Sequence, residues 1–434
     1  MIVQHLLINK PSNFGRKGTS INHYLIDLIT FILYNQDLHE TRAVLATMID
    51  FSKAFNRQNH LILVTKLSDM GVPGWLLKII IGFLEERKLV VTFNGARSDS
   101  KDMPGGGPQG TVLGMFLFLI LINKAGFGDQ NKKLGDKLTA AATKRDEITK
   151  MHAKYVDDMT AAHVVNLKED LTSNDQKVWV KPPLKRERFE QVLRDDKNLM
   201  QEQITDLCQY ADENEMKLNK DKTKVMLFNS AKQSDFMPEI VVGDENLEVV
   251  EEFKLLGVMI TSNLKWETNT DYITKKAYKR LWMIRRLKNL GMSTKSLVKI
   301  FTTQIRSVLE FGAVTWHPML TKENSNAIER VQKTALAIIL SPDYTSYDEA
   351  LDKTKLERLD KRRIVLSLNF AKKATKHPEH SKWFSKQDVN TNVKTRALKP
   401  QYKPVQARTN RLLKSPVPYL TQLLNNDAAE NIRP

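Results

Sequence analysis

The spacing of apolar and polar residues predicts alternating helices and strands in the first part of the chain. Residues 19–36 carry apolar side chains at helical intervals, which predicts a helix. Residues 42–51 form a short apolar run that ends with a carboxylate and an aromatic residue, as is typical of a buried strand. Residues 60–88 predict two helices separated by Gly-Val-Pro-Gly, and residues 89–95 predict a strand that closes on Asn-Gly.

The middle of the chain continues this mixture. Residues 103–123 predict a glycine-rich loop that leads into an apolar helix, and residues 124–151 are polar and predict an exposed insertion. Residues 155–161 predict a short β-hairpin. Residues 187–217 predict an amphipathic helix, because their apolar residues recur at helical intervals, namely Leu199, Ile204, Leu207, Cys208, Ala211 and Met216.

Residues beyond 222 predict two more strands and then helices alone. The strands are expected at residues 223–229 and 253–261, and helical patterns continue to about residue 372. This order predicts an α+β or α/β catalytic body followed by an all-helical region. The tail, residues 373–434, is basic, with eight Lys or Arg against two Asp or Glu between residues 391 and 434. Such a composition is typical of a mobile arm on nucleic acid.

The charge balance indicates a polyanionic partner. The 434 residues include 67 Lys or Arg and 50 Asp or Glu, a formal net charge of +17, which favours nucleic acid or an acidic membrane surface. Cys208 is the only cysteine, so no disulfide can form within the chain, and an intracellular protein of the cytoplasm or nucleus is expected. The longest apolar runs, residues 75–84 and 114–122, are shorter than the roughly 18 residues of a membrane span. Neither a membrane segment nor a signal peptide is predicted.

Asp157 and Asp158 are adjacent carboxylates inside a largely apolar stretch. A second adjacent pair, Asp195 and Asp196, is flanked by basic residues on a predicted helix, where solvation alone explains it. Two half-buried carboxylates repel each other unless a cation neutralises them. Mg²⁺ is the hard, oxygen-binding cation that accompanies phosphate chemistry. A surface turn, in which Asp is simply a good turn former, is the alternative.

Asp50 stands near the end of a predicted apolar strand, far from Asp157 and Asp158 in the sequence. If folding brings the strand end beside the tip of the predicted hairpin, three carboxylates converge. Such a cluster suits two-metal phosphoryl transfer, in which ions about 3.5 to 4 Å apart activate the attacking hydroxyl and stabilise the leaving oxygen.

Five motifs stand in a fixed order along the chain: MIDFSKAF, GGGPQGTVLG, YVDD, LNKDKTKVMLF and FKLLGVMI. This order resembles that of reverse transcriptases from non-LTR retrotransposons, the jockey-like elements in particular, and the resemblance extends roughly from residue 9 to residue 340. It implies a right-hand polymerase fold. Partial fingers would occupy residues 1–49, the palm residues 50–262, and a helical thumb-like region residues 263–372, with the partly flexible basic tail at residues 373–434.

The resemblance implies RNA-directed DNA polymerisation, in which dNTPs are added to a primer 3′-hydroxyl along an RNA template with two Mg²⁺ ions, or Mn²⁺ in their place. Asp50, Asp157 and Asp158 would be catalytic metal ligands, and the carbonyl of Phe51 would assist them. Lys222 would be the general acid for the pyrophosphate leaving group. Without the family, a lysine in this lysine-rich turn is more often simply solvated.

The resemblance also implies a nucleotide site. Phe55 would exclude a ribose 2′-hydroxyl and select deoxynucleotides, although on its own it is typical of a core aromatic. Gln109 and Gly110 would line the incoming nucleotide and the template base, in a loop whose backbone must approach a ligand closely. Tyr155, in the predicted hairpin, would also contact the nucleotide. The glycines of this loop have the spacing of a dinucleotide fingerprint, but two prolines interrupt it and a polar segment separates it from the preceding strand, which excludes that site.

Residues 272–306 contain ten Lys or Arg and no Asp or Glu. Apolar residues repeat at helical spacing from Ile273 to Leu287, so one face packs and the other is cationic. The cationic face would bind the phosphates of a template–primer duplex in a salt-sensitive way, and added solubility is the alternative. The cations expected to make this contact are Lys275, Lys276, Lys279, Arg280, Arg285 and Arg286.

Three hypotheses follow from the sequence. The chain is a polymerase domain, or a truncated and inactive copy that binds nucleic acid, or a basic structural protein in which the Asp pair is incidental. The joint presence of Asp50, Gln109, Asp157 and Asp158 argues against the third. Asn56, where many relatives carry a second Asp, and a start within the expected fingers keep the second open.

Overall fold

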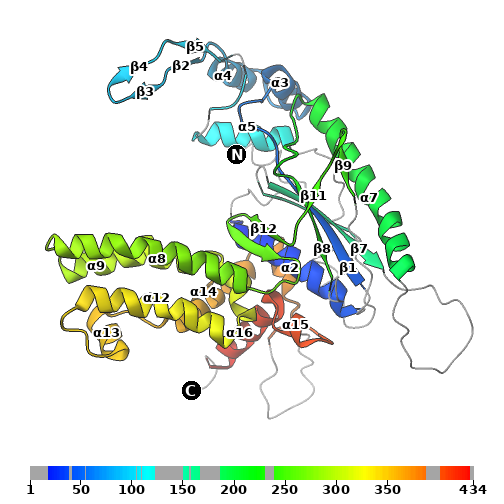
Figure 1. Cartoon of the computed structure of the whole chain (residues 1–434). Helices are drawn as coiled ribbons and strands as arrows, with labels where there is room; N and C mark the ends of the chain where they lie inside the picture. The colour runs from blue at the N-terminus through cyan, green and yellow to red at the C-terminus, as the bar shows by residue number, and fades with distance from the viewer. Residues whose placement is uncertain are drawn as a thin grey trace, which may run out of the picture.

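A five-stranded sheet forms the centre of the computed structural model (Figure 1). The structure describes residues 18–38, 42–53, 55–103, 105–108, 110–122, 150–155, 158–166, 186–229, 239–387 and 401–430. Three of the predicted features lie outside these described residues, namely Gln109, Asp157 and the polar insertion as far as residue 149.

The strand order in this sheet is β11-β8-β1-β7-β6. The predicted strand β1 (Arg42–Ile49) is confirmed and lies in the middle, antiparallel to both β7 (Asp158–Asn166) and β8 (Lys224–Phe228). β6 (Lys150–Tyr155) pairs antiparallel with β7, and β11 (Glu248–Val249) pairs parallel with β8. The predicted boundary between the partial fingers, residues 1–49, and the palm, residues 50–262, lies directly after β1, although β1 pairs with strands of the palm.

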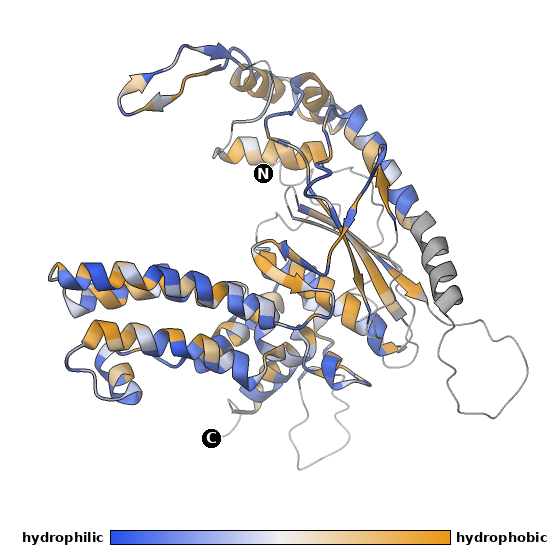
Figure 2. Cartoon of the chain, in the orientation of Figure 1, coloured by the Kyte–Doolittle hydropathy of each residue, from blue (hydrophilic) through white to orange (hydrophobic). Residues whose placement is uncertain are grey.

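Both faces of the sheet are covered, which explains why β1 is a continuous apolar run. One face packs on α2 (Ile21–Leu38), the helix predicted at residues 19–36. The other face packs on α5 (Val112–Ile122) and α7 (Arg186–Glu213), which confirm the helices expected after the glycine-rich loop and at residues 187–217. Figure 2 shows the sheet and α5 as largely hydrophobic.

Above the sheet, α3 (His60–Asp69) and α4 (Gly74–Leu84) pack against α5, as the break at Gly-Val-Pro-Gly predicts. An exposed ribbon follows α4 and is built from short paired strands. Asn94 and Gly95 form its tip with φ angles of 48° and 83°, so the predicted Asn-Gly turn is confirmed. The strands of this ribbon are β2 (Lys88–Leu89), β3 (Thr92–Phe93), β4 (Ala96–Arg97) and β5 (Lys101–Asp102).

The single strand predicted at residues 253–261 is wrong, because these residues form a hairpin of β12 (Glu252–Leu255) and β13 (Val258–Thr261) outside the central sheet. Leu256 and Gly257 make the turn with φ angles of 48° and 86°. The glycine inside the apolar run marked this turn. A further small hairpin pairs β9 (Val241–Val242) with β10 (Glu245–Asn246).

Helices alone follow the hairpin, as predicted. The core of the α2 face continues without interruption into these helices, so sheet and helical region are packed against each other. The helices are α8 (Glu267–Asn289), α9 (Thr294–Ile300), the π-helix η2 (Phe301–Arg306), α10 (Ser307–Leu309), α11 (Ala313–Trp316), the 3₁₀ helix η3 (His317–Met319), α12 (Lys322–Leu340), α13 (Tyr347–Thr354) and α14 (Leu359–Ala374). No helix in the described part of the chain is long and apolar enough to cross a membrane.

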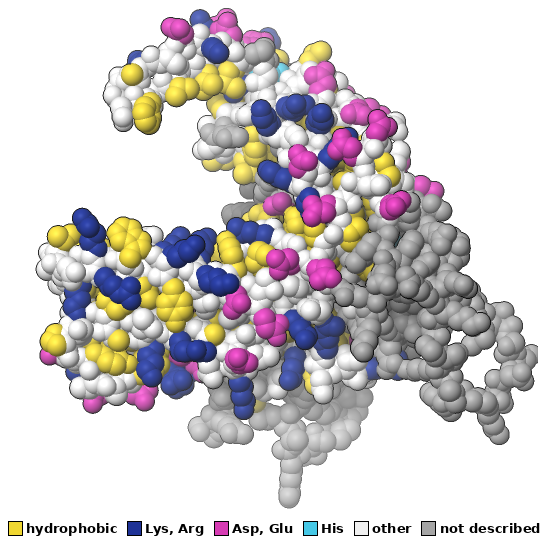
Figure 3. All heavy atoms as spheres, viewed as in Figure 1, with side chains coloured by type: hydrophobic (Ala, Val, Ile, Leu, Met, Phe, Trp, Pro, Cys, Tyr) yellow, Lys and Arg dark blue, Asp and Glu magenta, His cyan; other side chains and the backbone are white. Residues whose placement is uncertain are grey.

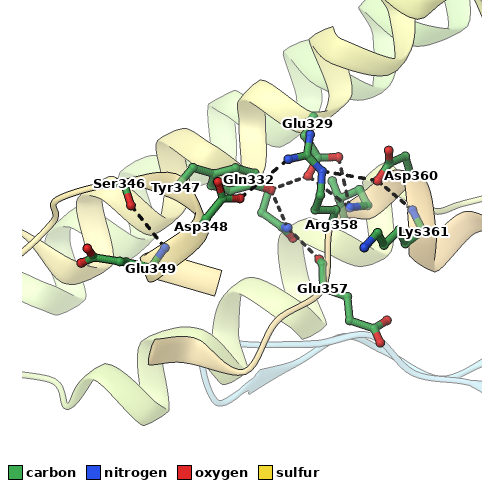
Figure 4. A network of polar contacts seen from close by, with 11 residues as sticks. Glu329, Gln332, Ser346, Tyr347, Asp348, Glu349, Glu357, Arg358, Asp360 and Lys361 are labelled. Atoms are coloured by element: carbon green, nitrogen blue, oxygen red, sulfur yellow. Dashed lines mark hydrogen bonds and ion pairs between the residues drawn. The ribbon is translucent and has the colours of Figure 1, made fainter. Parts of the chain in front are cut away.

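A buried polar network fixes the ends of these helices (Figure 4). Glu329 on α12 accepts the backbone N–H of Leu359 at 3.1 Å, which satisfies a free donor at the start of α14. Gln332 donates to the Tyr347 hydroxyl and to the Glu357 carbonyl, both at 2.9 Å. The network therefore joins α12 to α13 and α14.

The C-terminal residues fold back onto α2, so the predicted mobile arm is wrong for residues 401–430. The 3₁₀ helix η4 (His380–Trp383), α15 (Asn410–Leu413) and α16 (Pro416–Glu430) share a core with α2 and α14. The net positive charge of the tail concealed this packing, because the Lys and Arg residues stand almost entirely before α16, while residues 415–430 contain none and supply the apolar residues Val417, Leu420 and Leu424 of the core.

Candidate active site

The end of β1 and the β6–β7 hairpin meet at one edge of the sheet. Ile49 pairs with Met159, so the next positions, Asp50 and Asp158, face each other across the two strands. Tyr155 pairs with Asp158 and closes the hairpin. The structure thus brings together two of the three predicted carboxylates, and the third, Asp157, is outside the described residues.

Asp50 and Asp158 belong to the sheet face that packs on α2. Residues directly opposite on antiparallel strands point to the same face, and side chains alternate along each strand. Met48 and Ala162 lie in the core shared with α2. Burial raises the pKa of Tyr24 on α2 above its usual range, and the charge of Asp158 raises it further, which places that carboxylate near α2.

Asp50 has one carboxylate oxygen, Oδ2, that is buried and accepts no hydrogen bond. Its backbone is fixed on both sides, because its carbonyl accepts the N–H of Asn219 at 2.8 Å and its own N–H donates to the Thr223 hydroxyl at 3.2 Å. A buried carboxylate oxygen without a donor is unfavourable, and a bound cation would compensate for it. The donor chemistry therefore fits a divalent metal ion.

Lys222 reaches the same oxygen from the turn before β8. Its Nζ lies 3.7 Å from Asp50 Oδ2, while its side chain stays 69% exposed. An ion pair so exposed contributes little stability. The neighbouring Lys220 instead pairs with Glu245 at 2.9 Å, so the lysines of this turn are not equivalent.

A complete metal site cannot be built from the described residues alone. No group of three or more His, Cys, Asp or Glu side chains that could hold a metal ion occurs among them. The sequence predicts Asp157, which lies outside the described residues, as a further ligand. The backbone carbonyl oxygen of Phe51 is another ligand expected from the sequence. Phe51 is buried and forms an isolated β-bridge with Leu218.

Phe55 lies between this edge and α5. Its ring is half-buried and stacks on Phe118 with the ring centroids 4.6 Å apart. It therefore packs against the core, as expected of a core aromatic, while part of its surface stays accessible.

The glycine-rich loop packs closely on its own chain. Gly106 and Gly107 donate their backbone N–H groups to the carbonyls of Gln58 and Phe55, at 2.8 and 2.7 Å. A side chain at Gly106 would lie 2.9 Å from the Asn56 carbonyl oxygen. At Gly106 and Gly107 the backbone therefore lies close against residues 55–58. Gly110 differs, because it has a φ of 82° and a Cβ added there would meet nothing within 4 Å, which leaves it open to a ligand.

The structure exposes five of the six cations that the sequence predicts on the cationic face of α8, while their contact with nucleic acid stays a prediction. Lys275, Lys276, Lys279, Arg285 and Arg286 are exposed on this face. Arg280 is only half-exposed and donates to the Gln304 carbonyl, so it serves helix packing. Figure 3 shows Lys and Arg side chains over α8 and α9, across a hollow from the exposed ribbon.

Aromatic residues of the same face escaped the sequence prediction. Trp282 and Tyr278 are 61% and 42% exposed. Tyr272 has Lys254 of β12 and Lys276 over its ring, at 4.9 and 5.7 Å from the centroid. Aromatic rings set among cations at helical spacing are typical of nucleic-acid surfaces, and this pattern was readable in the sequence.

Residues 5–260 match the family model "Reverse transcriptase (RNA-dependent DNA polymerase)". The chain belongs to the reverse transcriptase family. The resemblance inferred from the five motifs is thereby confirmed. Enzymes of this family are RNA-directed DNA polymerases and depend on divalent metal ions.

Transposon proteins are among the relatives of this reverse transcriptase. It is 22% identical over 309 residues to "Probable RNA-directed DNA polymerase from transposon BS" of Drosophila melanogaster, covering 69% of this chain and 29% of that protein. It is 24% identical to "RNA-directed DNA polymerase from mobile element jockey" of Drosophila funebris, covering 66% of this chain and 27% of that protein. The chain thus spans less than a third of the length of these relatives.

Solved structures include more distant matches. Telomerase from Candida albicans, in complex with a fragment of telomeric RNA, matches with a TM-score of 0.39 and 10% identity, covering 86% of this chain and 53% of that one.

Proposed function

We propose that the chain is the polymerase domain of a non-LTR retrotransposon reverse transcriptase, which adds dNTPs to a DNA primer along an RNA template. The observation that carries this proposal is the meeting of Asp50 and Asp158 at one sheet edge, with a buried Asp50 oxygen that accepts no hydrogen bond. Family membership supplies the reaction class.

Asp50, Asp157 and Asp158 would hold two divalent ions, Mg²⁺ or Mn²⁺, with the Phe51 carbonyl assisting. When bound, the ions activate the primer hydroxyl and neutralise charge that develops on the phosphates. The fixed backbone of Asp50 keeps its carboxylate in place during this reaction. Lys222 lies near enough to Asp50 to donate a proton to the departing pyrophosphate, with 3.7 Å between Nζ and Oδ2.

The nucleotide site would lie between the carboxylates and α5. Phe55 offers a ring backed by Phe118, so a nucleotide sugar that clashes with it meets a supported wall. Gly110, Gln109 and Tyr155 would contact the incoming nucleotide and the template base. Of these, Gly110 has the open surroundings that such a contact needs.

The cationic face of α8 would hold the template–primer duplex by its phosphates. Lys275, Lys276, Lys279, Arg285 and Arg286 supply the charge. The exposed ring of Trp282 adds a contact that does not depend on salt. This face and the exposed ribbon border the same hollow (Figure 3).

Primer extension tests this proposal. The purified chain, given Mg²⁺, dNTPs and a DNA primer on an RNA template, should extend the primer, and Asp157→Asn should abolish extension because it removes a metal ligand. Asp195→Asn is the matched control, since it alters the solvated Asp pair. A properly folded chain that binds the duplex and extends no primer would refute the polymerase and support a nucleic-acid-binding remnant.

A further inference from the structure

One buried hydrogen bond links α2 to the strand that carries Asp158. The Tyr24 side chain is fully buried, and its hydroxyl donates to the Thr160 hydroxyl at 2.5 Å. Thr160 is itself 1% exposed. A buried tyrosine hydroxyl needs a partner, and this pairing satisfies it deep in the core.

Thr160 stands two residues after Asp158 on β7, so the two side chains share the face that packs on α2. The bond therefore holds β7 directly behind the predicted metal ligands.

The hairpin needs such a restraint for two reasons. Among the described strands, β6 is the last of the sheet, so within this part of the chain β1 is the only strand that pairs with the hairpin from outside it. Asp50 and Asp158 also face each other, and the repulsion of two carboxylates drives β7 away from β1 whenever no cation lies between them. A short polar contact on the α2 side resists this displacement.

We propose that Tyr24 and Thr160 are positioning residues for the catalytic hairpin, and that their hydrogen bond keeps Asp158 at metal-binding distance from Asp50. This inference rests on the proposed polymerase function. Neither residue touches the substrate. Their effect is on the geometry of the carboxylates, and so on the affinity for metal ions before any nucleotide binds.

Tyr24→Phe removes only the hydroxyl and tests this role. We expect weaker Mn²⁺ binding, by roughly three- to tenfold, because about one buried hydrogen bond no longer opposes carboxylate repulsion. The kcat of primer extension at low Mg²⁺ should fall by a similar factor, with the KM for dNTP unchanged. Calorimetry of Mn²⁺ binding to the full chain without nucleotide measures the first quantity, and steady-state extension measures the others.

Companion variants separate positioning from stability. Thr160→Val should reproduce Tyr24→Phe, and Thr160→Ser, which keeps the hydroxyl, should restore both readouts. Tyr34→Phe is the matched control, because Tyr34 is also buried in the same helix but has no bond to Thr160. Tyr34→Phe should leave the Mn²⁺ affinity and the kcat of primer extension unchanged, and any effect should be confined to the melting temperature.

The outcomes are distinguishable. Mn²⁺ affinity that is equal in the wild type and Tyr24→Phe would overturn the positioning role, even if the variant melts earlier. A wild-type chain that binds Mn²⁺ but extends no primer would overturn the proposed polymerase function. The proposed role of Tyr24 and Thr160 in positioning the carboxylates would then still hold. A wild-type chain that binds no Mn²⁺ would overturn both.

Discussion

At the scale of single residues, the unbonded oxygen of Asp50 separates this carboxylate from an ordinary surface acid. The backbone N–H and carbonyl of Asp50 are both hydrogen-bonded, and the buried side-chain oxygen that faces Lys222 accepts no hydrogen bond. Two lysines of one turn then take different roles. Lys220 is tied to Glu245, whereas Lys222 extends to the carboxylate.

We expect Lys222→Met to lower kcat of nucleotide addition by about 10²-fold, the lower range for loss of a general acid. Duplex affinity should hardly change, because one exposed lysine among many supplies little of the binding. Single-turnover extension and duplex titration measure these two effects. Lys220→Met is the control and should leave the rate unchanged. Equal rates of nucleotide addition for Lys222→Met and Lys220→Met would show that Lys222 is a solvated surface lysine and not a general acid.

At the scale of secondary-structure elements, α8 divides into two faces. Ile273, Ala277, Leu281 and Ile284 are buried against the helical core, as the sequence period predicts. The opposite face combines cations with exposed aromatic rings. The period could not show that Arg280 is taken up by the Gln304 carbonyl, because that contact comes from a helix more than twenty residues away.

The two kinds of side chain on α8 should respond differently to salt. The double substitution Lys275→Ala and Lys279→Ala should reduce the slope of log affinity against log salt by about 0.7 to 0.9 for each cation. Trp282→Ala should weaken binding by about 1 to 3 kcal/mol and leave the slope unchanged. Titrations of a labelled duplex at several salt concentrations measure both. Lys361→Ala, an exposed cation of α14, is the control, and an equal loss there would show that only net charge matters.

At the scale of the whole molecule, the C-terminal segment and α2 form one unit. Asp27 of α2 accepts the indole N–H of Trp383 at 2.9 Å. Asp37, at the other end of α2, accepts the backbone N–H of Thr409 at 2.6 Å, and Thr409 is the residue whose side chain caps α15. Since α2 also supports the carboxylate hairpin, the C-terminal segment is part of the structure that holds the site.

The contact between α2 and the C-terminal segment contains opposing titratable groups. Burial, together with the charge of neighbouring histidines, lowers the pKa of His23 to about 4 and that of His380 to about 2. His377 stacks beside them, with its ring centroid 4.4 Å from that of His380, and burial lowers its pKa too. Burial raises the pKa of Asp27 to about 7.

These shifts predict that stability falls as the pH drops below about 6.5. Below this pH the histidines of the unfolded chain are protonated, whereas the buried histidines of the folded chain stay neutral. The free energy of unfolding therefore falls by about 1.4 kcal/mol per pH unit for each proton by which the two states differ. Asp27 opposes the effect, because between about pH 4 and 7 the folded state binds its proton and the unfolded state does not. Asp27→Asn keeps an acceptor for Trp383 and should steepen the loss. Chemical denaturation between pH 4.5 and 8 measures it, and an unchanged slope would contradict the burial of Asp27.

The sequence predicted the fold class and several residues that the structure brings together at the candidate site. The apolar run of β1 and the five ordered motifs identified Asp50, Asp158 and Lys222, and the structure brings all three to one sheet edge. Leu256 and Gly257 were placed inside a single strand, because a two-residue turn barely interrupts apolar alternation. Tyr24 and Thr160 carried no signal at all, since their bond joins residues 136 positions apart.

By itself, the sequence determined the local elements, the net charge and the family, because these depend on side-chain type and short-range periodicity. Only the tertiary structure decided that the basic tail packs on α2, that Arg280 is taken up in packing, and that one oxygen of Asp50 is buried without a donor. These features depend on which surfaces remain after the cores have formed. Burial and long-range pairing are properties of the packed chain, and no short window of sequence contains them.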